Sequence, residues 1–335
     1  MKQFITGLMA ATVLSVAGLP ASAFAADEKP AVIYDLGGKF DKSFNEAAYL
    51  GAEKYKADTG IAYREFEIQN EAQREQALRK FAQDGNSPVV IAGFSATAAI
   101  EKVADEFPDT KFVIIDAVVE KPNVRSVVFK DEEGSYLVGL LGALASKTGT
   151  VGFVGGMDVP LIRKFACGYV GGVKATNKDA KVIQNMTGDT PAAWNDPAKG
   201  AEIAKSQMDQ GADVIYHAAG GTGIGVLQAV ADAGKLGIGV DSNQNGLHPG
   251  HVLTSMVKRV DVAVYNAFKD VADNKFTSGV QVLGLKENGV DYAVDKDNEK
   301  LITPEMKQAA EAAKADIIAG KIKVHDYMTD NKCPY

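Results

Sequence analysis

Apolar residues in this chain gather in short runs, and most runs are followed by a segment in which apolar positions recur with helical spacing. The first run covers residues 31–34 and the first helical segment covers residues 45–58. Short apolar strands that alternate with amphipathic helices are typical of a parallel sheet covered by helices on both faces. Because the alternation continues to residue 318, we expect two doubly wound α/β domains of similar size.

The pattern places the expected elements and the junctions between domains. We expect crossovers near residues 130–133, 257–260 and 284–288, which gives one lobe of residues 30–130 plus 258–285 and another of residues 131–257 plus 286–330. Strands are expected at 31–34, 61–67, 88–92, 111–116, 124–129, 151–154, 180–186, 213–217, 237–240, 252–257, 279–285 and 291–294. Helices are expected at 45–58, 71–83, 96–107, 134–146, 161–175, 197–210, 223–232, 261–274 and 305–318.

The length and charge of the chain narrow the function classes. A chain of 335 residues suggests two domains. The net charge is −7, and no basic run or basic helix occurs, so the features of nucleic-acid binding are missing.

The N-terminal segment resembles an export signal. Lys2 precedes a largely apolar stretch at residues 4–19, and Ala23-Phe24-Ala25 has the small-x-small pattern of a cleavage site. We interpret residues 1–25 as a cleaved signal peptide, because the apolar stretch is shorter than the ~20 residues of a membrane span. No cysteine occurs at the cleavage position, so we expect an exported protein without a lipid anchor.

The two cysteines, Cys167 and Cys333, both lie in the mature chain. Two cysteines in an oxidising compartment can form a disulfide, which would tie the C-terminal tail to a helix. We favour this bond over the alternative of two separate thiols.

Polar and glycine-rich segments follow the apolar strands in both halves of the chain. Ligands of open α/β sheets bind at the carboxyl ends of strands, so this recurrence predicts one site in a cleft between two domains. The segments are residues 35–45, 93–95 and 116 in the first half, and 155–156, 188–194, 218–223 and 241 in the second.

The segment at residues 35–46 joins a strand, a glycine turn and a helix start. Asp41 is a suitable helix cap, and Ser43 and Asn45 offer hydrogen-bonding groups beside it. Phe44 either packs the first helical turn against the sheet, which is the commoner role, or lies against a flat ligand.

Four further side chains have both a structural and a functional interpretation. Asp116 and Asp241 each end an apolar strand, where a carboxylate can cap the next turn or accept hydrogen bonds from a ligand. Lys258 follows a strand at a crossover and either reaches the cleft or pairs on the surface with Asp261. Trp194, the one tryptophan, lies in a polar loop and either packs or stacks on a flat ligand.

The sequence favours binding over catalysis. The glycines at residues 220–223 lack the Lys-Ser/Thr of a phosphate loop, so they favour close approach of an uncharged ligand. We find no nucleophile elbow, no zinc-protease motif and no cysteine cluster, and we expect neither a metal nor another cofactor. The pair Glu132-Glu133 is interpreted as solvated surface, and His217 as structural or exposed.

Seven motifs in order resemble the basic membrane protein family, the purine nucleoside receptor-like substrate-binding proteins of ABC transporters. The resemblance covers roughly residues 30–325. The motifs are Asp41-Lys-Ser-Phe-Asn45, Lys111-Phe-Val-Ile-Ile-Asp116, Glu132-Glu-Gly-Ser-Tyr-Leu-Val-Gly139, Trp194-Asn-Asp-Pro-Ala-Lys199, Ala219-Gly-Gly-Thr-Gly223, Val240-Asp-Ser-Asn-Gln244 and Thr254-Ser-Met-Val-Lys-Arg259.

The resemblance implies a type I periplasmic-binding-protein fold, in which two lobes joined by three crossovers trap a small ligand. It implies a purine nucleoside or nucleobase, such as adenosine, guanosine, inosine or adenine, that is passed to an ABC permease in the inner membrane. Many relatives carry a lipid-anchoring cysteine that this chain lacks, so we expect a free periplasmic protein, and we expect a monomer. A sugar or autoinducer receptor, a secreted nucleoside-processing enzyme and a partner of a membrane sensor are alternatives.

The resemblance also assigns roles by position. The base would lie near Asp41, Ser43 and Asn45, with Asp116 bonded to its edge. Stacking would come from Phe44, Phe94 or Trp194. Ribose hydroxyls would bind Asp241 and Lys258, with the backbone near Gly221 and Thr222 alongside.

Overall fold

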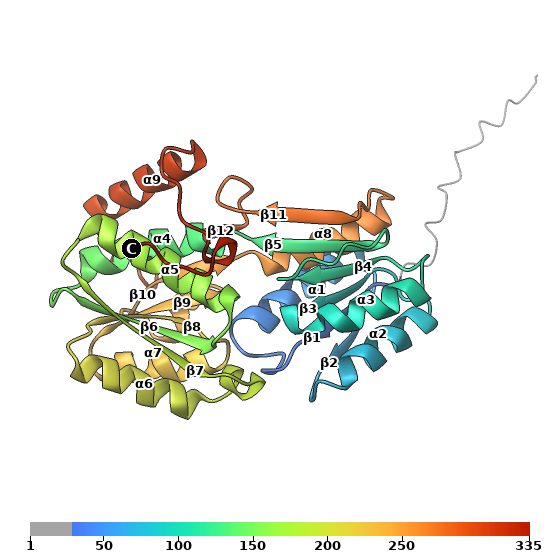
Figure 1. The fold of residues 1–335 in the computed structure, drawn as a ribbon, viewed down its shortest axis with the longest axis horizontal. Helices are drawn as coiled ribbons and strands as arrows, with labels where there is room; N and C mark the ends of the chain where they lie inside the picture. Colours follow the sequence, from blue (N-terminus) through green and yellow to red (C-terminus); the bar gives the residue numbers. More distant parts are fainter. Residues whose placement is uncertain (1–28) are drawn as a thin grey trace, which may run out of the picture.

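Two α/β lobes lie side by side in the computed structural model, which describes residues 29–335 (Figure 1). Each lobe is built on one six-stranded sheet, and all neighbouring strands run parallel except β10 and β12. The chain therefore has the predicted fold, two doubly wound lobes of the type I periplasmic-binding-protein class. The predicted signal peptide at residues 1–25 lies outside the described residues.

The first lobe contains most of the N-terminal half of the chain and one late strand, with sheet order β11-β5-β4-β3-β1-β2. Helices α1 (Phe44–Thr59) and α8 (Val260–Ala272) cover one face, and α2 (Gln73–Gln83) and α3 (Thr97–Glu106) cover the other. The strands are β1 (Ala31–Tyr34), β2 (Arg64–Glu67), β3 (Val89–Ala92), β4 (Phe112–Ile115), β5 (Val124–Phe129) and β11 (Gly279–Leu283).

The second lobe repeats this plan with sheet order β12-β10-β9-β8-β6-β7. Helices α4 (Asp131–Ala145), α5 (Pro160–Thr176) and α9 (Pro304–Ile318) lie on one side, and α6 (Pro197–Asp209) and α7 (Thr222–Asp232) on the other. The strands are β6 (Thr150–Met157), β7 (Lys181–Gly188), β8 (Val214–Ala218), β9 (Leu236–Asp241), β10 (Val252–Lys258) and β12 (Val290–Tyr292).

The chain passes between the sheets three times, after β5, after β10 and after β11. The chain leaves the second sheet along β10 and returns to it, after the last crossover, as β12. Because β12 enters the sheet beside β10, at the end where β10 left it, the two strands run antiparallel. Most element bounds lie within three residues of the expected ones; β6 is longer at its carboxyl end, and β2 begins at Arg64 rather than at residue 61.

One buried apolar cluster extends through both lobes. It includes Phe129 at the end of β5, Leu137 on α4 and Val264 on α8, so the crossovers are embedded in core. Two smaller clusters fill the outer faces, under α2 and α3 and under α6 and α7. Among residues 29–335, no helix has the length and apolar content needed to cross a bilayer.

Candidate functional site: a cavity between the lobes

A cavity of about 620 Å³, including its open mouth, lies where the carboxyl ends of strands from the two sheets face each other. This volume is within the usual range for small-molecule sites. Most of the predicted ligand-binding residues line it: Asp41, Phe44, Asn45, Phe94, Asp116, Trp194, Asp241 and Lys258.

Three predicted ligand-binding residues are not part of the wall described for this cavity: Ser43, Gly221 and Thr222. The Ser43 hydroxyl bonds to Asp241, and the Thr222 hydroxyl is held within its own lobe. Gly220, rather than Gly221, reaches the cavity. Ser43 and Thr222 therefore support the wall instead of forming it.

Asp41 organises the start of α1. Its carboxylate accepts hydrogen bonds from the backbone N–H groups of Ser43 (2.8 Å), Asn45 (3.0 Å) and Glu46 (3.1 Å). These groups lack partners within the helix, so Asp41 caps it although Ser43 stands at the N-cap position. Burial raises the pKa of Asp41 to about 7, against the effect of the three backbone hydrogen bonds.

Asn45 fixes the loop that follows β1. Its amide donates to the carbonyls of Asp35 (3.1 Å) and Gly38 (3.2 Å), and its oxygen accepts from the Asp35 N–H (3.0 Å). The side chain therefore positions the loop at the cavity more than it offers free donors to a ligand.

Asp35 also lines the cavity, although nothing in its sequence context distinguishes it from an ordinary strand-end residue. Its carboxylate accepts from Arg74 Nη2 (2.7 Å) and from Ser95 Oγ (2.6 Å). The close approach of Gly93, whose φ is +96°, leaves no room for a Cβ beside the Asp35 carboxylate. Two strand-end loops are thereby joined on one wall.

Asp116 and Asp241 occupy matching places in the two lobes. Asp116 follows β4 and Asp241 ends β9, and each of these strands is third in its sheet order. Both residues have a left-handed backbone, with φ of +70° and +60°, which is unfavourable for a residue with a Cβ. Such strain, retained at two strand ends beside a cavity, is typical of functional sites.

Lys258 brings a buried positive charge to these carboxylates. Its Nζ lies 2.7 Å from Asp116 Oδ2 and 3.3 Å from Asp131 Oδ1. Burial alone would lower the pKa of Lys258, but the charges of Asp116, Asp131 and Asp241 outweigh it and raise the pKa above its ordinary value. Lys258 is therefore charged at neutral pH, and it is not the exposed surface lysine that the alternative interpretation described.

Trp194 stands on the cavity wall because its loop is anchored to α7. The Thr222 hydroxyl donates to Ala193 O (2.8 Å) and accepts from the Asp196 N–H (2.7 Å). A Cβ on Gly156 would lie 2.2 Å from Trp194 Cζ3, so this glycine in β6 makes room for the indole ring.

The lobes touch each other beside the cavity. Ser43 Oγ donates to Asp241 Oδ2, Ser242 Oγ donates to Ser43 O (2.9 Å), and Gln244 Nε2 donates to Lys42 O (2.9 Å). Because these hydrogen bonds join the helix start of one lobe to the end of β9 in the other, the arrangement is closed.

The interpretation of Glu132 as solvated surface was wrong. Its side chain is buried and lies 3.1 Å from Lys164 Nζ, which also donates to Phe129 O (2.8 Å). His217 is also buried, with Nε2 2.9 Å from Gln244 Oε1, and burial lowers its pKa to about 4.

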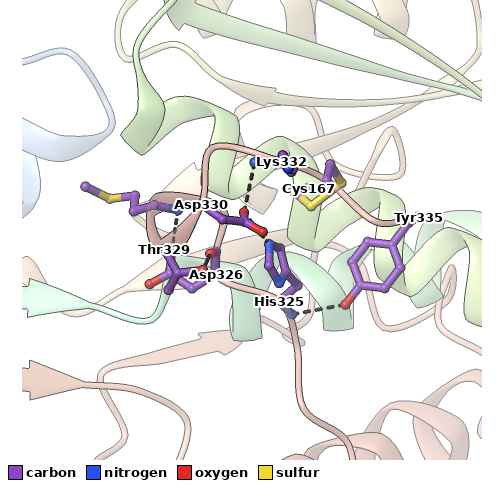
Figure 2. The surroundings of a disulfide bond; sticks show 9 residues. Cys167, His325, Asp326, Thr329, Asp330, Lys332 and Tyr335 are labelled. Carbon is purple, nitrogen blue, oxygen red and sulfur yellow. Dashed lines mark hydrogen bonds and ion pairs between the residues drawn. A yellow bond between two sulfur atoms is a disulfide. The ribbon is translucent and has the colours of Figure 1, made fainter.

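A disulfide joins Cys167 on α5 to Cys333 near the C-terminus (Figure 2). The tail that it holds is also ordered by its own contacts. Tyr335 Oη accepts from the His325 N–H (3.0 Å), and His325 Nε2 lies 3.0 Å from Asp330 Oδ1. Asp326, in the same tail, lies 3.5 Å from Lys164 Nζ, so the tail reaches the side chains around the first crossover.

Comparisons with known proteins agree with this architecture. Residues 29–327 match the Bmp family, described as "ABC transporter substrate-binding protein PnrA-like". The "ABC transporter nucleoside-binding protein BmpA" of Lactococcus lactis is 34% identical over 321 residues, covering 89% of each chain. A solute-binding protein of an ABC transporter system from Aeropyrum pernix has a TM-score of 0.82 and 31% identity, covering 89% of this chain and 93% of that one.

One expectation, that the protein has no lipid anchor and is free in the periplasm, is contradicted by the relatives. An "Uncharacterized lipoprotein" of Pyrococcus abyssi is 37% identical over 88% of this chain and 73% of its own length, and similar proteins of two other Pyrococcus species carry the same description. The expectation depended on residues before position 29, outside the described part of the chain, so the fold gives it no support. The matched residues, the two lobes and the similarity to a solute-binding protein together show that this chain belongs to the Bmp family of PnrA-like ABC transporter substrate-binding proteins.

Proposed function

We propose that this protein captures a purine nucleoside or nucleobase, such as adenosine, guanosine, inosine or adenine, in the cavity between its lobes. As a member of its family, it serves an ABC transporter and passes a small molecule to the permease. The observation that carries the ligand assignment is the combination of aromatic faces with Asp116, whose Oδ1 is buried without a hydrogen-bond partner.

The aromatic side chains suit a flat ligand. Phe44 and Phe94 line the cavity from the first lobe and Trp194 lines it from the second. A base held between aromatic rings gains ~1–3 kcal/mol from each stacking contact. Rings that come from both lobes would hold the base only when the lobes are together, which couples binding to closure.

The charged side chains suit the edges of a nucleoside. Asp116 Oδ1 would accept a hydrogen bond from a ring N–H or an exocyclic amino group, which satisfies a buried acceptor. Asp241 and Lys258 would take the ribose hydroxyls, because a hydroxyl both donates and accepts. The wall carries four aspartates, Asp35, Asp41, Asp116 and Asp241, and one lysine, and this excess of carboxylates disfavours a phosphorylated ligand.

Further support comes from the relative in Lactococcus lactis whose name describes nucleoside binding. We propose that the ligand leaves this protein chemically unchanged, that the protein acts as a monomer, and that its lobes are residues 30–130 plus 258–285 and residues 131–257 plus 286–330. The stacking role of each aromatic and the ribose role of Asp241 and Lys258 are parts of this proposal.

The test is calorimetric titration of protein that has been unfolded, washed and refolded, so that no ligand from purification remains. Adenosine, guanosine, inosine, adenine, ribose and galactose are titrated in turn, and the recovered nucleoside is checked for breakdown. Binding of a purine with recovery of intact ligand is expected. Binding of a sugar alone would overturn the ligand assignment, and a breakdown product would overturn the receptor role.

An Asp241→Ala variant tests whether Asp241 binds the ribose. If Asp241 holds the sugar, this variant weakens nucleoside binding far more than nucleobase binding. Equal weakening of the two ligands would remove Asp241 from the ribose site.

A further inference from the structure

Asp131 is a buried carboxylate outside the wall described for the cavity, and none of the roles above uses it. It is the first residue of α4, directly after the first crossover, and none of its surface is exposed. Neither of its carboxylate oxygens has a hydrogen-bond partner in the described structure. A buried carboxylate with so little compensation is costly, which calls for an explanation.

The partner of Asp131 is the lysine of the cavity. Asp131 Oδ1 lies 3.3 Å from Lys258 Nζ, and Asp116 Oδ2 lies 2.7 Å from the same nitrogen. Lys258 and Asp116 line the cavity, so Asp131 contacts the ammonium group from outside it. Lys258 is therefore held between a carboxylate on the cavity wall and one behind it.

The surroundings leave the ammonium group few alternative positions. Its nitrogen lies 5.0 to 5.5 Å from the ring centres of Phe44, Phe129 and Phe165, and the Lys258 side chain is 2% exposed. Asp116 is its nearest charged partner, and without Asp131 the position of the ammonium group would depend on Asp116, for which a ligand would also compete.

We propose that Asp131 is a positioning residue for ligand binding, which fixes the Lys258 ammonium group at the cavity wall and ties it to the first crossover. Lys258 itself ends β10 at the second crossover, so the ion pair joins two of the three connections between the lobes. Asp131 and Lys258 both belong to elements of the second lobe, whereas Asp116 follows β4 in the first lobe. The Lys258–Asp116 ion pair therefore spans the lobes, and by holding Lys258 in place Asp131 links its binding geometry to closure. This inference rests on the proposed binding role of the cavity.

Glu132, the next residue, provides a matched control. It is also buried on the first turn of α4, but it pairs with Lys164 at 3.1 Å and not with Lys258. Replacing Asp131 or Glu132 by its amide removes one buried negative charge from the same helix turn. Only the Asp131 change touches the lysine of the cavity.

The dependence of Kd on pH separates a positioning role of Asp131 from a simple loss of stability. The charged or titratable groups that act on Asp131 are Lys258 from β10, Lys164 from α5, Asp116 after β4, Tyr216 from β8 and the neighbouring Glu132 on α4. Burial raises the pKa of Asp131 to about 6. Protonation on going from neutral to mildly acidic pH would therefore release Lys258 and weaken binding, and an asparagine cannot take up this proton.

The experiment compares D131N and E132Q with the wild type, using the purine that the wild type binds best, at about pH 7.5 and about pH 5.5. We expect D131N to raise Kd by about tenfold at the higher pH and to lose the part of the acid-induced weakening that Asp131 contributes, while the part that comes from Asp41 on the cavity wall remains. E132Q should leave Kd within about twofold while lowering the melting temperature comparably. An unchanged Kd in D131N, or an equal rise in both variants, would overturn the proposal.

Two further measurements keep the inference testable. NMR of the ¹⁵N-labelled lysine side chains in ligand-free protein should show a shifted Lys258 signal in D131N and not in E132Q. This NMR measurement does not require a ligand. An unshifted Lys258 signal in D131N would overturn the positioning role of Asp131, whereas failure of the wild type to bind any purine would overturn the proposed function. If D131N does not fold, D131E replaces it, because this variant keeps the negative charge but moves the carboxylate. D131E should raise Kd while retaining the acid-induced weakening of binding. An unchanged Kd would count against the proposal.

Discussion

The hydroxyl of Ser43 donates a hydrogen bond to the Asp241 carboxylate across the cleft, so the start of α1 in one lobe is fastened to the end of β9 in the other. Both residues are buried, and Asp241 is also one of the charged groups on the cavity wall. The contact therefore couples closure of the lobes to the position of the Asp241 carboxylate, which is proposed to bind the ligand.

Replacing Ser43 by alanine should favour the open arrangement. One buried hydrogen bond to a carboxylate would be lost, and we expect apparent Kd to rise about threefold to tenfold. Small-angle X-ray scattering of the ligand-free variant should show a larger radius of gyration than that of the wild type. Ser206→Ala, at an exposed position on α6, is the control. If Ser43→Ala matches this control in both measurements, the Ser43–Asp241 hydrogen bond does not hold the lobes closed.

Replacing Gly156 by alanine should displace the ring of Trp194 while leaving the tryptophan itself in the chain. The added Cβ would lie 2.2 Å from Cζ3 of the indole, so the ring must shift. We expect weaker ligand binding and a loss of about 1–3 kcal/mol of stability from overpacking. Gly188→Ala is the matched control, because its Cβ would make an ordinary contact with Ala193 at 3.5 Å. Undiminished affinity in Gly156→Ala would show that the ring position does not matter for binding.

Removing the disulfide should destabilise the folded protein. Cys167 and Cys333 are separated by 166 residues, so the bond closes a long loop in the unfolded chain. A double replacement by serine should lower the free energy of unfolding by about 3 to 5 kcal/mol, measured by urea denaturation. Reduction of the wild type should give the same loss. Detection of two free thiols in unreduced, unfolded protein would contradict the bond.

His217 should contribute an acid-induced loss of stability. Its pKa is about 4 in the fold because burial disfavours the charged ring, whereas the unfolded chain takes up the proton near 6.5. Stability that is fully present above about pH 6.5 is therefore lost as the pH falls toward 4. In His217→Gln this contribution disappears, and the difference between the two proteins should change by about 3 kcal/mol over that window. Parallel stability curves for the two proteins would disprove the prediction.

The fold could be predicted from the sequence because central strands such as β1, β3, β4 and β8 are buried on both faces and the helices that cover them show an apolar face, so local pattern and final packing agree. The cavity could be located because strand-end loops collect at one edge of a parallel sheet. The pattern did not predict the antiparallel β12, because its direction depends on which connection returns to the sheet.

The wall and its supports could be predicted only in part. Phe165 lines the cavity, but on α5 it has the spacing of an ordinary core residue. Asp131 and Glu132 belong to an acidic helix start, which usually faces solvent, and only the packing of α4 against the crossovers shows that they are buried. Ser43 and Thr222 lie beside wall residues in sequence, and the direction in which a hydroxyl points is not encoded in spacing.

The placement of Trp194 has a practical consequence. The chain contains one tryptophan, and that residue stands on the cavity wall. Tryptophan emission, excited selectively over that of the 11 tyrosines, therefore reports on the cleft alone. A bound base or a change in lobe separation would alter the emission directly, so the unlabelled protein carries its own optical sensor, suited to rapid-mixing kinetics of capture and release.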